Sequence, residues 1–106
     1  MKTLFVGGGH GCRAILELIV QGKLEVLSPE IAGVVDPSEG APGMVYARQK
    51  GWPTFPSVQE GLSLDGLELV IEVTGDDDVL ETIRRLAPEG VRIWDHDMAR
   101  VFWDLD

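Results

Sequence analysis

The strongest constraint on the fold lies near the start of the chain, where an apolar run leads into four glycines within five positions. Residues 3–6 are apolar or β-branched, the glycines fall within residues 7–11, and apolar side chains then recur at helical spacing, at Cys12, Ile15, Leu16 and Ile19. A strand, a glycine turn and a helix in this order are typical of the first βαβ unit of nucleotide-binding folds. Glycines allow a tight turn, and they allow a phosphate to approach free N–H groups at the positive end of the helix.

The dinucleotide fingerprint G-x-G-x-x-G/A fits this stretch in two registers. The register that we place first uses Gly7, Gly9 and Cys12, with the small Cys12 side chain at the contact between helix and strand. The second register uses Gly9, Gly11 and Ala14, and it leaves the strand two residues longer. From this stretch we expect six residues to form the phosphate-binding turn: Gly7, Gly8, Gly9, His10, Gly11 and Cys12.

Two side chains of this turn have alternative interpretations. His10 either contacts a phosphate or is a solvated loop histidine. Cys12 is better explained as a small packing residue than as a nucleophile, although a helix N-terminus lowers the pKa of a thiol and so favours reactivity. As the only cysteine it forms no internal disulfide, which is usual in a reducing cytosol, so we expect a cytoplasmic protein.

The rest of the chain alternates apolar runs with helical patterns. We expect strands at residues 2–6, 31–36, 52–55, 67–74 and 91–94, and helical segments at residues 11–21, 42–50, 56–62, 79–86 and 98–106. Such alternation predicts a parallel sheet with right-handed crossovers. The expected fold is α/β, a doubly wound five-stranded Rossmann sheet in the order 3-2-1-4-5 with helices on both faces, formed by one domain over residues 1–106.

Asp36 is the most informative residue after the glycines, because it ends the second expected strand. In doubly wound folds an acid at this position accepts hydrogen bonds from the adenine ribose and repels a 2′-phosphate, which favours NAD over NADP. The alternative is an aspartate that merely ends a strand before Pro37, but the glycines upstream favour the ribose interpretation. Thr74 and Gly75 end the fourth strand, where the strand order reverses, so we expect them to line the ligand crevice. For Thr74 a simple strand-to-helix turn is an equal alternative.

Other polar clusters are better explained by helix capping. Asp76, Asp77 and Asp78 are expected to cap a helix rather than to bind a metal, and their charge makes that helix start a poor phosphate site. His96 lies between Asp95 and Asp97, but adjacent residues rarely face each other, so we expect a helix cap there and assign no catalytic residue.

The net charge of −9, from 18 acidic against nine basic residues, argues against nucleic acids and anionic membranes as partners. No apolar run is long enough to cross a bilayer, and Met1-Lys2 leads directly into the first strand, so no signal peptide is expected. The last segment places Met98, Val101, Phe102 and Leu105 at helical spacing, and we expect most of that face to pack on the sheet. Any exposed part would serve a partner, either a second copy or a downstream domain of a longer chain.

The segments GGGHGC, GVVD, APG with ARQKGWPTFPS, and LELVIEVTG resemble the N-terminal NAD(P)-binding half of dehydrogenases. The most similar groups are homoserine dehydrogenase, dihydrodipicolinate reductase, aspartate dehydrogenase and the glucose–fructose oxidoreductases. The resemblance implies that Gly7, Gly9 and Gly11 cradle pyrophosphate, that Asp36 holds the ribose and that Thr74-Gly75 flank the nicotinamide side. The chain also resembles Rossmann-type regions that precede bacterial sensor histidine kinases.

Two departures from the dehydrogenases bear on function. The fifth strand ends in Trp-Asp-His-Asp, where the glucose–fructose group carries a catalytic lysine. In addition, we expect no substrate-binding second domain within these 106 residues. We therefore expect an NAD(H)-binding module, either sensory or regulatory or the cofactor domain of an oxidoreductase, without enzymatic activity of its own. The alternatives are an oxidoreductase completed by a partner chain or a missing C-terminal domain, and a Rossmann shell without cofactor that serves as an interaction surface.

Overall fold

The computed structural model describes residues 1–23 and 30–104, with the backbone alone for residues 102–104. The elements follow the order β1 (Lys2–Val6), α1 (His10–Val20), β2 (Glu30–Val35), α2 (Pro42–Gln49), β3 (Thr54–Phe55), α3 (Val58–Leu62), β4 (Leu69–Glu72), α4 (Asp77–Leu86), β5 (Arg92–Trp94) and α5 (His96–Asp104). Residues 24–29, between the expected helix at residues 11–21 and the expected strand at residues 31–36, lie outside the described residues. All strand pairs are parallel and the sheet order is β3-β2-β1-β4-β5, as predicted.

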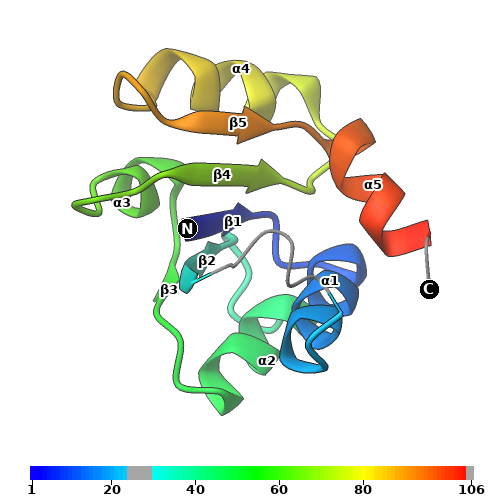
Figure 1. Cartoon of the computed structure of the whole chain (residues 1–106). Coiled ribbons are helices and arrows are strands. Elements are labelled where there is room, and N and C mark those ends of the chain that lie inside the picture. Colours follow the sequence, from blue (N-terminus) through cyan, green and yellow to red (C-terminus); the bar gives the residue numbers. More distant parts are fainter. Residues whose placement is uncertain (24–29, 105–106) are drawn as a thin grey trace.

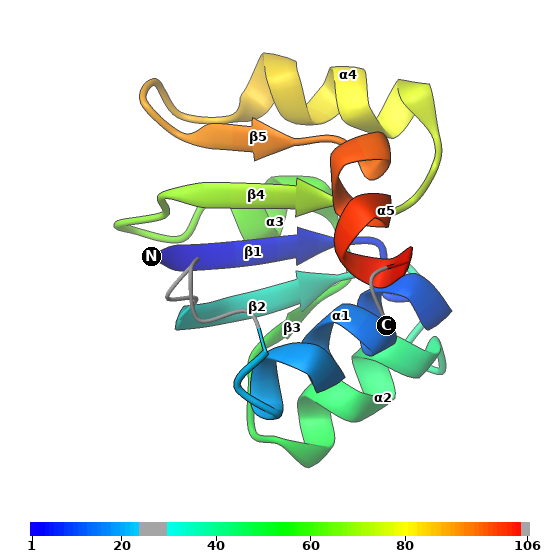
Figure 2. The same ribbon diagram turned by 45° about the vertical axis from the view of Figure 1, so that its right-hand side comes forward.

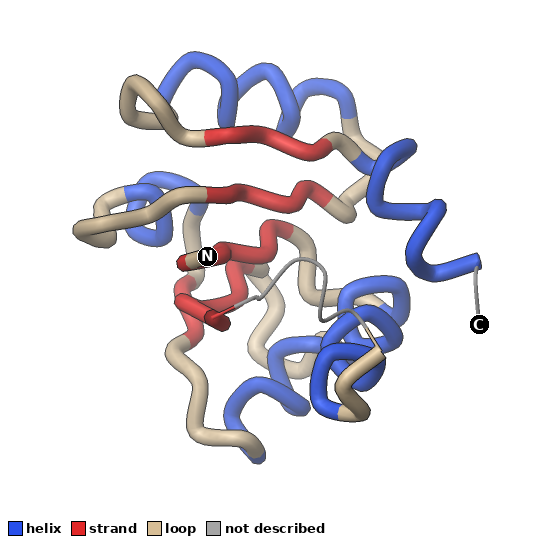
Figure 3. Tube along the Cα trace, viewed as in Figure 1, coloured by secondary structure: helices blue, strands red, loops and turns tan. Residues whose placement is uncertain are grey.

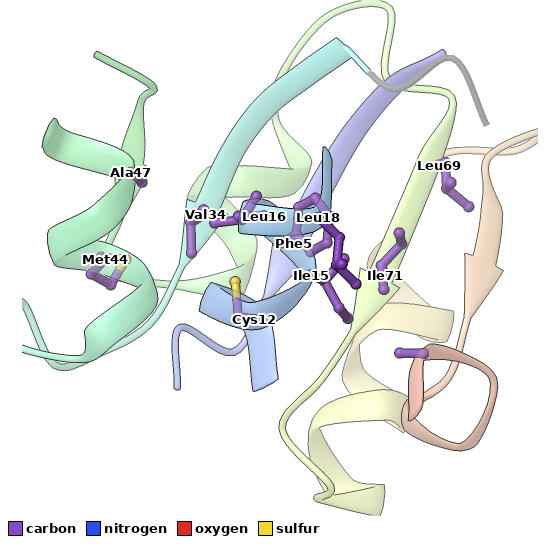
Figure 4. Packing of buried hydrophobic residues seen from close by; sticks show 11 residues of the cluster. Phe5, Cys12, Ile15, Leu16, Leu18, Val34, Met44, Ala47, Leu69 and Ile71 are labelled. Atoms are coloured by element: carbon purple, nitrogen blue, oxygen red, sulfur yellow. The ribbon is translucent and has the colours of Figure 1, made fainter. Parts of the chain in front are cut away.

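Helices cover both faces of the sheet, which confirms the doubly wound arrangement (Figures 1 and 2). One face packs against α1, α2 and α5 through a cluster that includes Phe5, Leu16 and Met44 (Figure 4). The other face packs against α3 and α4 through a cluster that includes Leu4 and Ile83. Neighbouring residues of β1 thus point into different cores, because side chains alternate along a strand. A central strand of a parallel sheet is buried on both faces, which explains its nearly continuous apolar sequence.

Caps set the starts of two helices at the positions that the sequence indicates. The Ser57 hydroxyl accepts a hydrogen bond from the Glu60 N–H at 3.2 Å and begins α3. The Asp76 carboxylate accepts one from the Asp78 N–H at 2.8 Å and begins α4. Capping side chains of this kind supply acceptors to N–H groups that have no partner within the helix. The aspartates after β4 therefore act as predicted for a helix N-terminus.

The last helix departs from the sequence-based expectation. It begins at His96 instead of Met98. Among residues 96–101, whose side chains are described, Ala99 is the buried one, 1% exposed against the core that contains α1. Because Ala99 faces the core, Met98 and Val101 point away from it, and they are 45% and 57% exposed. Two of the four residues of the expected packing face are therefore exposed, and the side chains of the other two, Phe102 and Leu105, lie outside the described residues. No helix in the described ranges has the length and apolar character needed to span a membrane.

Candidate functional site

The glycine turn lies at the carboxyl end of β1, on the edge of the sheet where all five parallel strands end. Figure 3 shows it as the loop that joins the first strand to the first helix. Gly7 has a φ of +104°, and a Cβ there would lie 2.8 Å from Thr74 Cγ2 and 2.9 Å from Thr74 N. At Gly9 a Cβ would meet nothing within 4 Å. Cys12, in contrast, is fully buried in the core between α1 and the sheet. The turn, the open approach and the packing position are what the first register of the fingerprint requires of Gly7, Gly9 and Cys12.

Some of the main-chain N–H and C=O groups of the turn already make hydrogen bonds within the protein. The Gly7 N–H donates to the Val35 carbonyl at 2.7 Å, and the Gly8 N–H donates to Asp36 Oδ2 at 2.8 Å. Gly8 also accepts a hydrogen bond from the Gly43 N–H through its carbonyl. No side chain of the described residues caps α1, and its first turn holds no acidic residue. The start of α1 thus has N–H groups available to an anion.

Asp36 points toward the glycine turn, as the ribose interpretation requires. Its Oδ2 accepts from Gly8, and its Oδ1 accepts from the Ser38 N–H at 2.8 Å. An ionised carboxylate has about four acceptor positions, so further hydrogen bonds remain possible. Asp36 also lines a cavity of about 260 Å³ at the ends of β1, β2 and β4, which we call the Asp36 cavity. Its lining is mainly apolar and includes Val35, Pro56, Val58 and Val79.

A second cavity, of about 300 Å³, lies on the other side of the turn, and we call it the α5 cavity. Its lining comes from the turn (Gly9, His10 and Gly11), from residues 73–75 after β4, and from His96, Ala99 and Arg100 of α5. Figure 2 shows α5 lying across the carboxyl ends of the strands. Thr74 lines both cavities. The structure therefore brings together His10, Asp36, Thr74, Gly75 and most of the glycine turn, whereas Gly8 and Cys12 line neither cavity.

Glu72, at the end of β4, is the site residue that sequence reasoning missed. It is fully buried, and its carboxylate accepts hydrogen bonds from two segments of the chain. Oε2 accepts from the Thr74 N–H at 2.7 Å, the Thr74 hydroxyl at 2.6 Å and the Gly75 N–H at 2.9 Å. Oε1 accepts from the His96 N–H at 3.0 Å and lies 2.6 Å from His96 Nδ1.

These contacts decide the protonation state of Glu72. Burial by itself raises the pKa of the carboxyl group, but the hydrogen bonds from Thr74, His96 and Gly75, together with the charge of His96, lower the pKa below its ordinary value. Glu72 is therefore a buried carboxylate that stays ionised, because every part of it faces a donor. The signal in the sequence is an acidic residue between the apolar Ile71 and Val73.

His96 pairs with Glu72 and not with either of its sequence neighbours. The hydrogen bond to Glu72 raises the pKa of His96 against the opposing effect of burial, and the charges of Glu72, Asp97 and Asp77 raise it further. Its other ring nitrogen, Nε2, lies 3.7 Å from Asp77 Oδ1, and the side chain is 25% exposed. Asp95 caps α5 by accepting a hydrogen bond from the Met98 N–H at 2.9 Å, as expected. The expectation of a histidine that only caps a helix is thus incomplete, because the ring has a buried carboxylate partner.

The remaining candidates do not support nucleophilic or metal chemistry. Burial, and secondarily the charge of Asp36, raise the pKa of the Cys12 thiol to about 12. A buried thiol that stays protonated at neutral pH is a poor nucleophile, which agrees with the packing role that the sequence favours for Cys12. In the part of the chain that the structure describes, no three His, Cys, Asp or Glu side chains are grouped to hold a metal ion.

Comparison with protein-family models, with curated proteins and with solved structures gives no significant match for this chain.

Proposed function

We propose that this chain is an NAD(H)-binding module that holds an adenine dinucleotide across the glycine turn. The observation that carries the proposal is the pair of cavities that flank this turn and share Thr74. The adenosine would occupy the mainly apolar Asp36 cavity, the diphosphate would lie at Gly9 and the start of α1, and the nicotinamide half would enter the α5 cavity. Ligands of open α/β sheets bind in the crevice outside the carboxyl ends of the strands, where the order reverses.

The orientation of Asp36 supports NAD over NADP as the ligand. Its carboxylate lines the proposed adenosine site and accepts hydrogen bonds from the Gly8 and Ser38 N–H groups. There it can accept hydrogen bonds from the ribose hydroxyls, whereas its negative charge would repel a 2′-phosphate. The role that follows is sensory or regulatory binding of NAD(H), or service as the cofactor domain of a larger oxidoreductase.

A second candidate function, an oxidoreductase completed by a partner chain or a further domain, is favoured by one observation. The His96–Glu72 pair beside the α5 cavity has the arrangement of an acid–base group oriented by a carboxylate. The bound cofactor would supply the hydride chemistry. The two functions differ in one result: NADH binds in both, but only in the second is it oxidised when a 2-oxo acid and the completing partner or domain are present.

The test is a titration with NADH and NADPH, followed by tryptophan fluorescence and by the melting temperature. A ligand at 100 times its Kd stabilises the fold by about 2.7 kcal/mol. Asp36→Ala should weaken NADH binding by about tenfold or more, since a charge-assisted hydrogen bond contributes about 1.5–3 kcal/mol. It should also reduce the difference between the affinities for NADH and NADPH, because the charge that repels the 2′-phosphate is removed. Asp65→Ala is the matched control, because Asp65 is exposed in the turn before β4.

Two results would count against the proposal. A wild-type chain that binds neither NADH nor NADPH refutes dinucleotide binding and leaves the interaction surface as the function. A folded Asp36→Ala variant with unchanged affinity for both removes Asp36 from the site, while the rest of the proposal stands.

A further inference from the structure

The α5 cavity has two basic side chains on the same helix. His96 and Arg100 are four residues apart on α5, so they lie on one face of the helix, and both line the cavity that also includes Gly9–Gly11. Sequence reasoning assigned neither residue to a binding site.

Glu72 determines what His96 can offer to the cavity. Oε1 of Glu72 lies 2.6 Å from His96 Nδ1 and also accepts the backbone N–H of His96, so the ring is held at the start of α5 with Nδ1 occupied. When the ring carries a proton on each nitrogen, Nε2–H is the remaining donor. The carboxylate that fixes the ring also favours its charged form, because an opposite charge beside an imidazole stabilises the imidazolium.

We propose that His96 and Arg100 form an anion-binding wall of the α5 cavity, which contacts the diphosphate of the dinucleotide bound at the glycine turn. This inference rests on the proposed function, since the diphosphate is that of the same ligand. Glu72 is a positioning residue in this arrangement: it touches no ligand, but it holds His96 and the turn at Thr74-Gly75 together. Charge-assisted hydrogen bonds to phosphate are about twice as strong as neutral ones, so two cations would add substantially to the main-chain contacts.

The charged groups around His96 are compatible with this role. They are Glu72 from β4, Asp77 from α4, Asp97 and Arg100 from α5, and the titratable His10 from the turn. Glu72 is buried and saturated by donors, and the side chain of Asp77 is 90% exposed, so water and salt weaken its field. The binding of the anion is then coupled to the proton on His96, and affinity falls as this proton is lost at higher pH.

The experiment compares ligands with and without the diphosphate in matched variants. His96→Gln and Arg100→Gln are each expected to weaken NADH and ADP by about tenfold, the effect of one lost charge-assisted hydrogen bond, and to leave adenosine unchanged. The control is Arg84→Gln, which removes an exposed arginine of α4 that lines neither cavity. In the wild type the NADH affinity should fall as pH rises through the raised pKa of His96, and this dependence should be absent in His96→Gln.

The outcomes separate this inference from the proposed function. If NADH binds to the wild type and both folded variants bind NADH and ADP equally well, the anion-binding wall is refuted and the dinucleotide site remains. If the wild type binds no dinucleotide, inorganic pyrophosphate is titrated while the His96 ring signals are followed by NMR. A saturable shift that Arg100→Gln abolishes supports the wall without the dinucleotide, and the absence of any shift refutes both.

Discussion

Replacement of Glu72 by Gln tests whether the buried carboxylate holds the site together. The amide of Gln has one acceptor oxygen and one donor nitrogen, whereas the two carboxylate oxygens both accept. If the oxygen stays with Thr74 and Gly75, the new NH₂ group faces the His96 N–H, which loses its acceptor. One buried N–H without a partner costs about 1–3 kcal/mol of folding free energy. The His96 ring also loses its negatively charged hydrogen-bond partner, which adds to this cost. We expect a loss of about 2–4 kcal/mol, or about 10–20 °C in Tm for a domain of this size.

The pH dependence of the same variant separates the ion pair from simple packing. Folding lowers the pKa of Glu72, so its contribution to stability is complete above the ordinary value of 4.5 and is lost as pH falls through the folded-state pKa. Folding raises the pKa of His96, so its contribution is complete below 6.5 and is lost as pH rises through its folded-state pKa. The difference in unfolding free energy between wild type and Glu72→Gln should therefore be greatest between pH 4.5 and 6.5.

Urea unfolding followed by circular dichroism at pH 5.5 and pH 9 provides the measurement. Glu81→Gln, on the exposed face of α4, is the matched control and should stay within about 0.5 kcal/mol of the wild type. A Glu72→Gln variant as stable as this control, or a difference that does not change with pH, would refute the role given to the carboxylate.

Two further predictions concern the glycine turn and the thiol. Gly7→Ala should destabilise the fold by about 2 kcal/mol or more, because the backbone strain at a φ of +104° adds to the contact with Thr74, and thermal unfolding measures it. Gly9→Ala should leave stability near that of the wild type and weaken NADH, because its Cβ occupies the open approach; equal Tm losses in both variants would contradict this distinction. Cys12 should not react with a thiol reagent at pH 8 until the chain unfolds, since its pKa is raised to about 12; rapid labelling of the native protein would show that it is accessible.

The sheet could be predicted because its determinants are local. Apolar strand runs, the glycines after β1 and the caps at Ser57 and Asp76 are each read from a few adjacent residues, and parallel βαβ units leave few alternatives for strand order. The contact between Asp36 and the glycine turn has the same kind of origin, because the carboxyl ends of the neighbouring strands β1 and β2 lie at one edge of the sheet.

The rest of the site depends on contacts between distant residues. Glu72 and His96 are 24 positions apart, and no local pattern shows that an acid within an apolar strand meets a histidine after the next one. The exposure of Met98 and Val101 also depends on distant contacts. Helical spacing identifies an apolar face that includes both residues, but it does not show that α5 packs on the core through the small Ala99. Which face packs is decided by the shape of the neighbouring elements, which the sequence of one helix does not contain.

The double attachment of Glu72 has a consequence for local motion. The amide hydrogens of Thr74 and Gly75, and that of His96 in a different element, share one acceptor group. We expect an opening that moves the Glu72 side chain to release all three amides to solvent, so that they exchange together although they belong to separate parts of the chain. Loosening the end of β4 is then expected to loosen the start of α5 as well.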